Sequence, residues 1–470
     1  MKPKKFYITT AIDYVNGKPH IGHAFEKVIA DALNRYQQLN SNPSFFLTGT
    51  DENAQKNAEA AKEANIETQK FVDKNSKVFI ELCKKLNINY SRFIRTTEKE
   101  HKNKSQEIFK AVYDKGEIYK GKYEGNYCLG CESFITEKEL VDGKCPEHNK
   151  APEHISEDAY FFKLSKYQKQ IIKFIKTYIV PEKRKNEILS RLENEELRDL
   201  CVSRTNLTWG IDNPIDKEFK IYVWFDALIN YISGAESNWP ADIHVIGKGI
   251  NWFHSVIWPG MLLSLNYPLP KKLLVHGYLN IKGKKMSKSL GNIIDPIELA
   301  EKYSSDTVRY SLLRCSIFED SDYSEEILID RHNNELANKL GNLISRTTAL
   351  AEKYKPTQTE NTLLKKLKLK NIIKLIDNYE LDKALNEIFT FIDICNEYIQ
   401  KKKPWETKDQ KILYELIDSI KAITIILYPF IPETSEKIAK QLNFKLSLDQ
   451  IEKPIKIKSI KKSEILFKKI

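Results

Sequence analysis

The chain has 470 residues, with 75 Lys or Arg against 64 Asp or Glu, so its formal net charge is +11. This length exceeds one ordinary domain and predicts two or three, each with its own core. The positive charge fits a polyanionic partner, although a lysine-rich solvated surface explains it equally well.

The sequence argues against two classes of protein: secreted or membrane-spanning proteins, and disulfide-rich proteins. The N-terminus is basic but lacks an apolar signal core, and no later stretch is apolar enough to span a bilayer, which predicts a cytoplasmic protein without membrane contact. The seven cysteines, three of them close together, do not form a disulfide pattern. In a reducing compartment the cluster is a candidate metal site instead.

A strand, a loop and a helix are predicted at the start of the chain. The strand covers Phe6–Ala11, a loop with glycine and proline follows, and Ile21–Leu39 has apolar residues at helical spacing. A second apolar run, Phe45–Leu47, ends in Thr-Gly-Thr-Asp at residues 48–51. The order strand, loop, helix, strand is typical of the start of a parallel α/β sheet.

The composition changes between Gly116 and Asn213, where cysteines, aromatic residues and turn residues precede a charged helical stretch at 181–200. This interval is predicted to be an insertion. Sheet-like runs resume at Lys220–Phe225, Ile243–Gly247 and Lys272–Gly277. The parallel sheet is therefore predicted to be split in two by the insertion.

Only helical patterns follow Tyr323. They cover Ile327–Lys353, Leu381–Lys402 and Lys411–Leu427, separated by Pro, Asn and Lys clusters, and predict a helix bundle. The predicted fold class is α/β: a Rossmann-type parallel sheet split by an insertion and followed by an α-helical bundle.

Two short segments are candidates for phosphate binding. His20 and His23 lie where the first strand turns into its helix, and at a helix start the free N–H groups and the dipole favour anions. Gly22 leaves room for a purine ring against the backbone. Taken alone, a capped helix or a fortuitous histidine pair is the commoner explanation.

The second segment, Lys285-Met286-Ser287-Lys288-Ser289, is flanked by Gly283 and Gly291. Two lysines and two hydroxyls in a glycine-flanked loop suit a mobile clamp on a triphosphate. An exposed basic turn explains this segment equally well when it is considered alone.

Together, the two segments match, residue for residue, the two signature sequences of class I aminoacyl-tRNA synthetases, in the same order, and the chain resembles that family. The resemblance implies that the amino-acid carboxylate attacks the α-phosphate of ATP, with Mg²⁺ accompanying ATP. It implies catalytic roles for His20, His23, Lys285 and Lys288. It implies ATP contacts by Gly22, Glu26, Gly247, His276, Met286, Ser287 and Ser289.

Among class I enzymes the chain resembles the methionyl-tRNA synthetases, and the resemblance is carried by residues 10–17, 47–52, 222–227, 253–259 and 275–278. A narrow aromatic slot suits a thioether, and Asp51 at the end of a strand is placed to pair with the substrate α-ammonium group. For the aromatic residues, core packing is the commoner explanation outside the family context. The implied methionine-binding residues are Ile12, Tyr14, Asp51, Trp224, Ala227, Leu228, Tyr231, Phe253 and His254. His254 and the Tyr14 hydroxyl are the candidate hydrogen-bond donors toward sulfur.

The expected function is therefore ligation of L-methionine to tRNA(Met), and two alternatives stay open. Synthetases for isoleucine, valine and leucine carry a large editing domain in the insertion, and the interval here is too short for one. A cysteine enzyme has comparable size but is expected to hold zinc in the amino-acid pocket. A catalytically silent tRNA-binding protein on the same scaffold is the second alternative, although both signatures are intact.

A structural zinc knuckle is predicted in the insertion. Cys128-x-x-Cys131 and Cys145-x-x-His148 supply two ligand pairs for one tetrahedral Zn²⁺ per chain. His154 is the alternative candidate ligand. Four unligated residues are the alternative. The remaining cysteines, Cys83, Cys201, Cys315 and Cys395, are expected to be small core residues.

The helical region is predicted to bind the tRNA anticodon. Asn342 and Arg346 lie four residues apart, on one face of a predicted helix, and Trp405 follows the helix that ends near Lys402. The family resemblance assigns these three residues to the anticodon, whereas in isolation surface or packing roles are commoner. The chain lacks the C-terminal dimerisation domain of some relatives, so a monomer is expected.

The predicted domain order combines these expectations. The segments are 1–115, the first Rossmann half; 116–213, the insertion with the knuckle; 214–270, the second Rossmann half; 271–325, the lysine-signature loop and stem-contact region; and 326–470, the anticodon-binding bundle. Three departures from the family pattern, Gly249 for Asp, Asn53-Ala54 for His-Gly, and Asp13 for Pro or Tyr, are expected to affect efficiency more than identity.

Overall fold

The structure is a computed structural model that describes residues 5–146, 149–205, 207–235, 237–281, 283–285, 293–457 and 459–470. It forms two compact units. The first unit comprises Met1–Pro19, Phe45–Glu81 and Tyr90–Val275, and the second comprises His20–Ser44, Leu82–Asn89 and His276–Ile470. Within the described ranges, no helix combines the length and the apolar character needed to cross a membrane.

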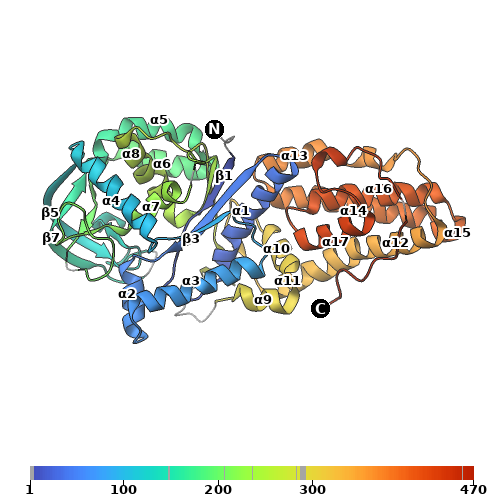
Figure 1. Ribbon diagram of the computed structural model, residues 1–470, viewed down its shortest axis with the longest axis horizontal. Coiled ribbons are helices and arrows are strands. Elements are labelled where there is room, and N and C mark those ends of the chain that lie inside the picture. Colours follow the sequence, from blue (N-terminus) through green and yellow to red (C-terminus); the bar gives the residue numbers. More distant parts are fainter. Residues whose placement is uncertain are drawn as a thin grey trace. The chain divides into compact units, whose positions relative to one another are not determined.

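The first unit is built on a seven-stranded sheet with the order β2-β3-β1-β12-β13-β8, in which β4 also pairs with β3. Strands β1 and β3 of this sheet are labelled in Figure 1. The strands are β1 Phe6–Thr10, β2 Asp13–Tyr14, β3 Ser44–Asp51, β4 Arg92–Arg95, β8 Ile179–Val180, β12 Ile243–Gly247 and β13 Leu273–His276. β1, β3 and β12 are buried along almost their whole length, as expected for strands covered on both faces.

The two halves of the predicted sheet join directly, because β1 and β12 pair in parallel with Ile8 opposite Ile243 and Thr10 opposite Val245. The insertion therefore leaves the sheet continuous. The chain leaves the carboxyl ends of these adjacent strands in different directions, and such a point is where open α/β sheets bind ligands. β8 was not predicted: it comes from the insertion and pairs in parallel with β13.

The run Lys220–Phe225 was predicted to be sheet-like, and this prediction was wrong. Only Lys220–Ile221 forms a strand, β11, and Val223–Ser233 forms helix α7. Residues 223–231 of α7 are all buried, so the helix has no exposed polar face and shows no helical spacing. A short, fully buried helix cannot be distinguished from a buried strand by periodicity.

The other helices of the first unit follow the strands in order. They are α2 Gln55–Glu63, α3 Thr68–Lys85, α4 Lys99–Asp114, α5 Gln168–Tyr178, α6 Glu182–Asn194 and α8 Trp258–Leu265. α3 continues by four residues into the second unit.

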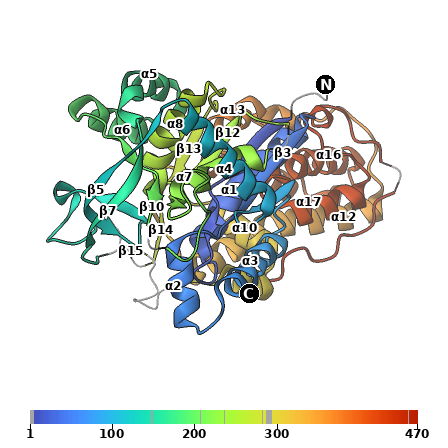
Figure 2. The same ribbon diagram turned by 60° about the vertical axis from the view of Figure 1, so that its left-hand side comes forward.

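The insertion carries an antiparallel sheet of its own with the order β6-β5-β7-β9. Its long strands are β5 Ile118–Cys128 and β7 Glu153–Phe162, which pair over ten residues and lie side by side in Figure 2. The short strands are β6 Ser133–Ile135 and β9 Leu200–Cys201, and β10 Ser203–Arg204 pairs separately with β11.

The second unit begins with α1 Ile21–Leu39, which has the predicted bounds. A small sheet, β14 Leu279–Ile281, β15 Lys284–Lys285 and β16 Ser321–Asp322, accompanies α9 Pro296–Tyr303 and α10 Ser305–Leu313. Helical backbone then runs without a break through α11 Glu325–Arg331, a π-helical segment His332–Gly341 and α12 Asn342–Tyr354. This run contains the predicted helix over 327–353.

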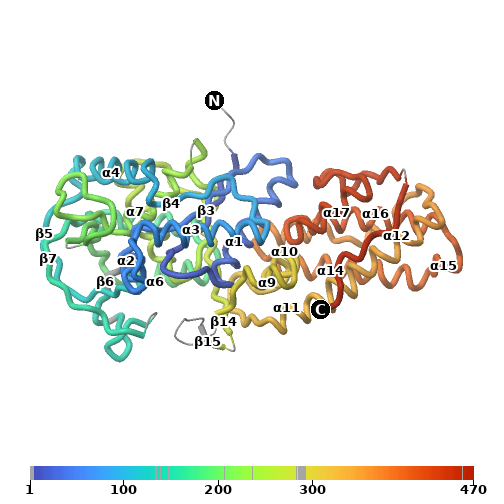
Figure 3. Tube along the Cα trace, turned by 60° about the horizontal axis from the view of Figure 1, so that its bottom comes forward, coloured from blue at the N-terminus to red at the C-terminus, as the bar shows by residue number. Residues whose placement is uncertain are grey.

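The predicted bundle is confirmed, and its helices lie side by side in Figure 3. They are α12, α13 Leu369–Asp377, α14 Leu381–Lys402, α16 Gln410–Leu427 and α17 Pro432–Leu442, with the short α15 Pro404–Thr407 after α14. α16 is buried from Ile412 to Leu427 and packs against α12, α14 and α17, so it is the central helix.

Candidate functional site

The two histidines of the first signature cap the start of α1. His20 is the N-cap residue, and its Nδ1 accepts a hydrogen bond from the Gly22 N–H at 3.1 Å. His23 Nδ1 accepts one from the His20 N–H at 3.0 Å, and the two ring centroids are 3.8 Å apart. Because both Nδ1 atoms accept, the proton of each neutral ring is on Nε2. The contacts that cap the helix therefore also fix the tautomer of both rings.

Glu26 and His276, both predicted to contact ATP, lie together in the second unit. Glu26 Oε2 is 3.1 Å from His276 Nε2, and His276 Nδ1 is 2.7 Å from the Gly277 carbonyl oxygen. Both side chains are buried. The His276 ring thus bridges the Glu26 carboxylate and the Gly277 carbonyl.

The structure describes only part of the second signature segment, residues 285–289. Lys285 belongs to the backbone of β15, whereas Met286, Ser287, Lys288 and Ser289 lie outside the described residues. Gly247, another predicted ATP contact, is the last residue of β12 at the carboxyl edge of the sheet.

A cavity in the first unit gathers eight of the nine predicted methionine-binding residues. About 20 Å³ of its volume is open to a water-sized sphere. Its lining consists of Ala11, Ile12, Tyr14, Asp51, Trp224, Ala227, Leu228, Asn230, Tyr231, Ile250 and His254. The ninth residue, Phe253, stacks on Trp224 with ring centroids 3.7 Å apart, and Tyr14 meets Trp224 edge-on at 6.3 Å.

Three buried polar atoms of the cavity residues lack a hydrogen-bond partner within the described part of the chain: Asp51 Oδ1, Tyr14 OH and Asn230 Oδ1. Burial, and then repulsion by Asp226, raise the pKa of Asp51. Both ring nitrogens of His254 are engaged, Nδ1 with the Ile250 carbonyl at 2.9 Å and Nε2 with the Tyr231 hydroxyl at 2.7 Å. Of the two donors predicted to face sulfur, only the Tyr14 hydroxyl is therefore uncommitted.

A buried polar network fixes α7, which carries five of the cavity residues. Asp226 Oδ2 accepts from Asn53 at 2.8 Å, and its Oδ1 lies 2.6 Å from His101 Nε2 and 2.9 Å from Ser105 Oγ. Asn53 also donates to the Thr96 carbonyl. Asn53, one of the departures from the family pattern, thus links the end of β3 to α7.

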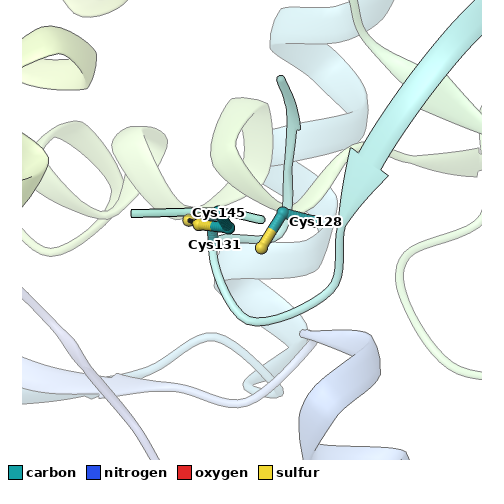
Figure 4. Close-up of side chains that lie close together, drawn as sticks. All are labelled: Cys128, Cys131 and Cys145. Atoms are coloured by element: carbon teal, nitrogen blue, oxygen red, sulfur yellow. Dashed lines mark hydrogen bonds between the residues drawn. The ribbon is translucent and has the colours of Figure 1, made fainter. Parts of the chain in front are cut away.

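Three of the predicted metal ligands converge at the end of β5 (Figure 4). The Sγ atoms of Cys128, Cys131 and Cys145 all lie within 4.8 Å of one another. Hydrogen bonding to Cys128, and then burial, raise the pKa of the Cys131 thiol. Sulfur atoms gathered in this way fit a tetrahedral metal ion. The fourth predicted ligand, His148, lies outside the described residues, and His154 is an exposed residue outside the group.

Two of the three predicted anticodon residues, Asn342 and Arg346, line a groove of about 650 Å³ in the bundle. Asn342 and Arg346 of α12 line one side, and Asp393, Asn396 and Gln400 of α14 are among the residues on the other. The groove lining is completed by Asn338, Lys339, Glu397 and Lys401. The Arg346 guanidinium lies over the Trp405 ring at 5.4 Å and donates to Gln400 at 3.2 Å.

Sequence patterns did not indicate Asn230, Lys56 or the α14 side of the groove. Asn230 lies three residues after Ala227 on α7, a spacing that would have indicated it had the helix been predicted. The four other cysteines, Cys83, Cys201, Cys315 and Cys395, are buried as expected.

Comparison with known proteins decides the family. The family model described as tRNA synthetases class I (M) matches residues 6–157 and 147–348, and a model of the anticodon-binding domain of tRNA ligases matches 361–469. The methionine–tRNA ligase of Clostridium acetobutylicum is 42% identical over 99% of this chain and 78% of its own length. The chain belongs to the methionyl-tRNA synthetase family. The methionine–tRNA ligase of Thermotoga maritima is 41% identical over 94% of this chain and 75% of its own length.

Solved structures of the family agree with this assignment. Mycobacterium tuberculosis methionyl-tRNA synthetase in complex with methionyl-adenylate matches with a TM-score of 0.94 and 34% identity over 99% of each chain. Its apo form matches with a TM-score of 0.86 and 31% identity, over 99% of this chain and 98% of that one. As a member of the family, the chain is an ATP-dependent class I aminoacyl-tRNA synthetase with the split Rossmann-type sheet and helix bundle described above.

Proposed function

We propose that the chain activates L-methionine with ATP to give methionyl-adenylate and pyrophosphate, and then transfers the methionyl group to the 3′ end of tRNA(Met), releasing AMP. The observation that carries this proposal is the cavity at the carboxyl edge of the sheet, where aromatic rings surround one buried carboxylate. It has one acidic group for an α-ammonium and an apolar lining for a thioether, which is the composition a methionine site needs.

Asp51 is the proposed partner of the methionine α-ammonium group. Its Oδ1 is buried and unpartnered among the described residues, so an incoming ammonium supplies a charge-assisted hydrogen bond that the protein itself does not provide there. The Tyr14 hydroxyl is the proposed donor toward sulfur. Because the cavity holds little more than a water molecule, the stacked rings of Trp224 and Phe253 separate to admit the side chain.

Charge stabilisation is the proposed task of the signature residues. The Nε2–H groups of His20 and His23 donate to phosphate oxygens as negative charge moves toward the departing pyrophosphate. Lys285 and Lys288 neutralise the same charge with their ammonium groups, and Mg²⁺ enters with ATP as part of the substrate. The proposed contacts to the rest of ATP are Gly22, Glu26, Gly247, His276, Met286, Ser287 and Ser289.

The metal at the cysteine cluster is proposed to be one structural Zn²⁺, held by Cys128, Cys131, Cys145 and His148. A closed set of four ligands cross-links the loop after β5 and leaves no position for substrate. For the tRNA, Asn342 and Arg346 are proposed to hydrogen-bond anticodon base edges while Trp405 stacks a base. We further propose that the protein acts in the cytoplasm, where tRNA is charged, and that it is a monomer, which light scattering tests.

Amino-acid-dependent ATP–pyrophosphate exchange tests this function. Metal-replete protein is expected to exchange with methionine and to give at most background exchange with cysteine, isoleucine, leucine or valine. Exchange driven by cysteine would favour the cysteine alternative. If no amino acid supports exchange while tRNA still binds, the chain is a silent tRNA-binding protein.

A further inference from the structure

Lys56, in the first turn of α2, places a positive charge against the candidate methionine cavity. Its Nζ lies 3.2 Å from the centroid of the Tyr14 ring and donates to the Gly130 carbonyl at 3.1 Å. Its backbone N–H donates to the Glu132 carboxylate at 2.7 Å. Tyr14 lines the cavity, whereas Gly130 and Glu132 belong to the cysteine loop, so this lysine connects the two.

The cysteine loop accepts hydrogen bonds at three consecutive carbonyls, Gly130 to Glu132. The Trp224 indole N–H donates to the Cys131 carbonyl at 3.2 Å, and the Tyr222 hydroxyl donates to the Glu132 carbonyl at 2.6 Å. The Lys56 ammonium supplies the third donor. Two of these three donors, Lys56 and Trp224, also contact the rings of the cavity, so the loop fixes the positions of both.

The charges around Asp51 are unbalanced without Lys56. Two other buried carboxylates act on Asp51: Asp226 from α7 and Glu132 from the cysteine loop, and both raise its pKa. Lys56 lowers the pKa of Asp51, and burial lowers the pKa of Lys56 itself to about 8, so its positive charge is lost toward alkaline pH. The Tyr14 hydroxyl also interacts electrostatically with Asp51. Asp226 is already bonded to Asn53, His101 and Ser105, and Glu132 to Tyr127 and the Lys56 N–H. Asp51 Oδ1 is therefore the acceptor left for a ligand among the described atoms of these three carboxylates.

We propose that Lys56 is a positioning residue for methionine binding: its ammonium group holds the Tyr14 ring and the cysteine loop in place beside Asp51, the proposed partner of the substrate α-ammonium. This inference rests on the proposed function of the cavity. Lys56 is the positive charge beside three neighbouring carboxyl groups, so it offsets part of the repulsion among them.

The competing explanation is that Lys56 only fills space between α2 and the cysteine loop. The two explanations differ in what a charge-preserving substitution does. Lys56→Arg keeps the positive charge, whereas Lys56→Met keeps most of the volume and removes the charge. Lys62, an exposed lysine of the same helix, provides the matched control as Lys62→Met.

The experiment measures methionine- and ATP-dependent pyrophosphate exchange from pH 6 to 9, with the methionine Kd from tryptophan fluorescence. For Lys56→Met we expect the KM and Kd for methionine to rise about tenfold or more, because a charge-assisted contact is weakened, with the KM for ATP nearly unchanged. Without the lysine the pKa of Asp51 rises, so Asp51 is protonated at higher pH. The acid limb of kcat/KM for methionine therefore moves to higher pH. Lys56→Arg is expected to restore most of the affinity, and Lys62→Met to behave as the wild type.

Two outcomes would overturn the inference. One is that Lys56→Met leaves methionine binding and the pH profile unchanged in a variant whose circular dichroism is native. The other is that Lys56→Arg is as impaired as Lys56→Met and both lose methionine and ATP affinity equally, which is the pattern of a packing defect. The wild-type protein separates this test from that of the function, since absence of its methionine-dependent exchange would contradict the proposed function itself.

Discussion

A cluster of buried charged residues in the second unit allows the change in the free energy of unfolding to be predicted for one substitution. Arg309 of α10 and Asp31 of α1 are both fully buried and form an ion pair at 2.7 Å. The Arg309 guanidinium also donates to the carbonyls of Pro429 and Leu86 at 2.9 and 3.1 Å. The substitution Arg309→Leu removes all of these contacts without creating a large void.

The expected loss follows from the groups that stay behind. Removing one partner of a buried ion pair typically costs about 3–5 kcal/mol, because the other charge remains in the interior. Asp31 retains Arg35 at 2.7 Å and the Asn89 N–H, which lowers the cost. The carbonyls that lose their donors raise it, by about 1–3 kcal/mol for each one left buried and unsatisfied. These effects oppose each other, so Arg309→Leu is expected to destabilise the protein by about 3–5 kcal/mol.

Urea unfolding followed by circular dichroism at 222 nm measures this loss. We expect an earlier transition for the helical second unit in Arg309→Leu. The control is Lys110→Met, which breaks an exposed ion pair with Asp114 and should leave the midpoint unchanged. A decrease of less than about 1 kcal/mol in the free energy of unfolding of Arg309→Leu would contradict this prediction, because apolar packing would then replace the buried ion pair at little cost.

Three further predictions concern the proposed sites. Asp51→Asn is expected to raise the KM for methionine in pyrophosphate exchange by about 10- to 100-fold, since it removes the charge that receives the α-ammonium. Trp405→Ala is expected to raise the KM for tRNA in aminoacylation about tenfold or more while leaving exchange nearly intact, because one stacking contact contributes about 1–3 kcal/mol. Cys145→Ser is expected to reduce the zinc content from one per chain to nearly none, as measured by atomic absorption, and to lower thermal stability.

Each of these predictions has an outcome that contradicts it. An unchanged methionine KM in Asp51→Asn would remove that carboxylate from the binding site. Equal damage to exchange and charging in Trp405→Ala would count against an anticodon role. Wild-type protein purified without chelator and found to contain no zinc would contradict the structural metal, whatever the behaviour of Cys145→Ser.

Long regular segments were predictable from local pattern alone. The bounds of α1 and α14 match the prediction because each helix has one apolar face at helical spacing and ends next to a helix-breaking residue. The exposed charged stretch at 181–200 was less regular, and only Glu182–Asn194 is helical. α7 was missed because burial on all sides removes the spacing that identifies a helix.

The cavity shows which parts of the candidate site the sequence could and could not predict. All nine methionine-binding residues were taken from the family resemblance, and the structure places eight of them around one cavity, although their roles stay predictions. Contacts between distant residues, such as Asn53 with Asp226 or Lys56 with Gly130, depend on how α2, α7 and the cysteine loop pack. No periodicity encodes such contacts.

A crystal structure of the protein with L-methionine bound tests most directly whether this cavity binds the amino acid. We expect the methionine side chain between Tyr14, Trp224 and His254, with its α-ammonium within hydrogen-bonding distance of Asp51. Methionine bound elsewhere, with the cavity still filled by its own rings, would contradict the central claim that this cavity is the amino-acid site.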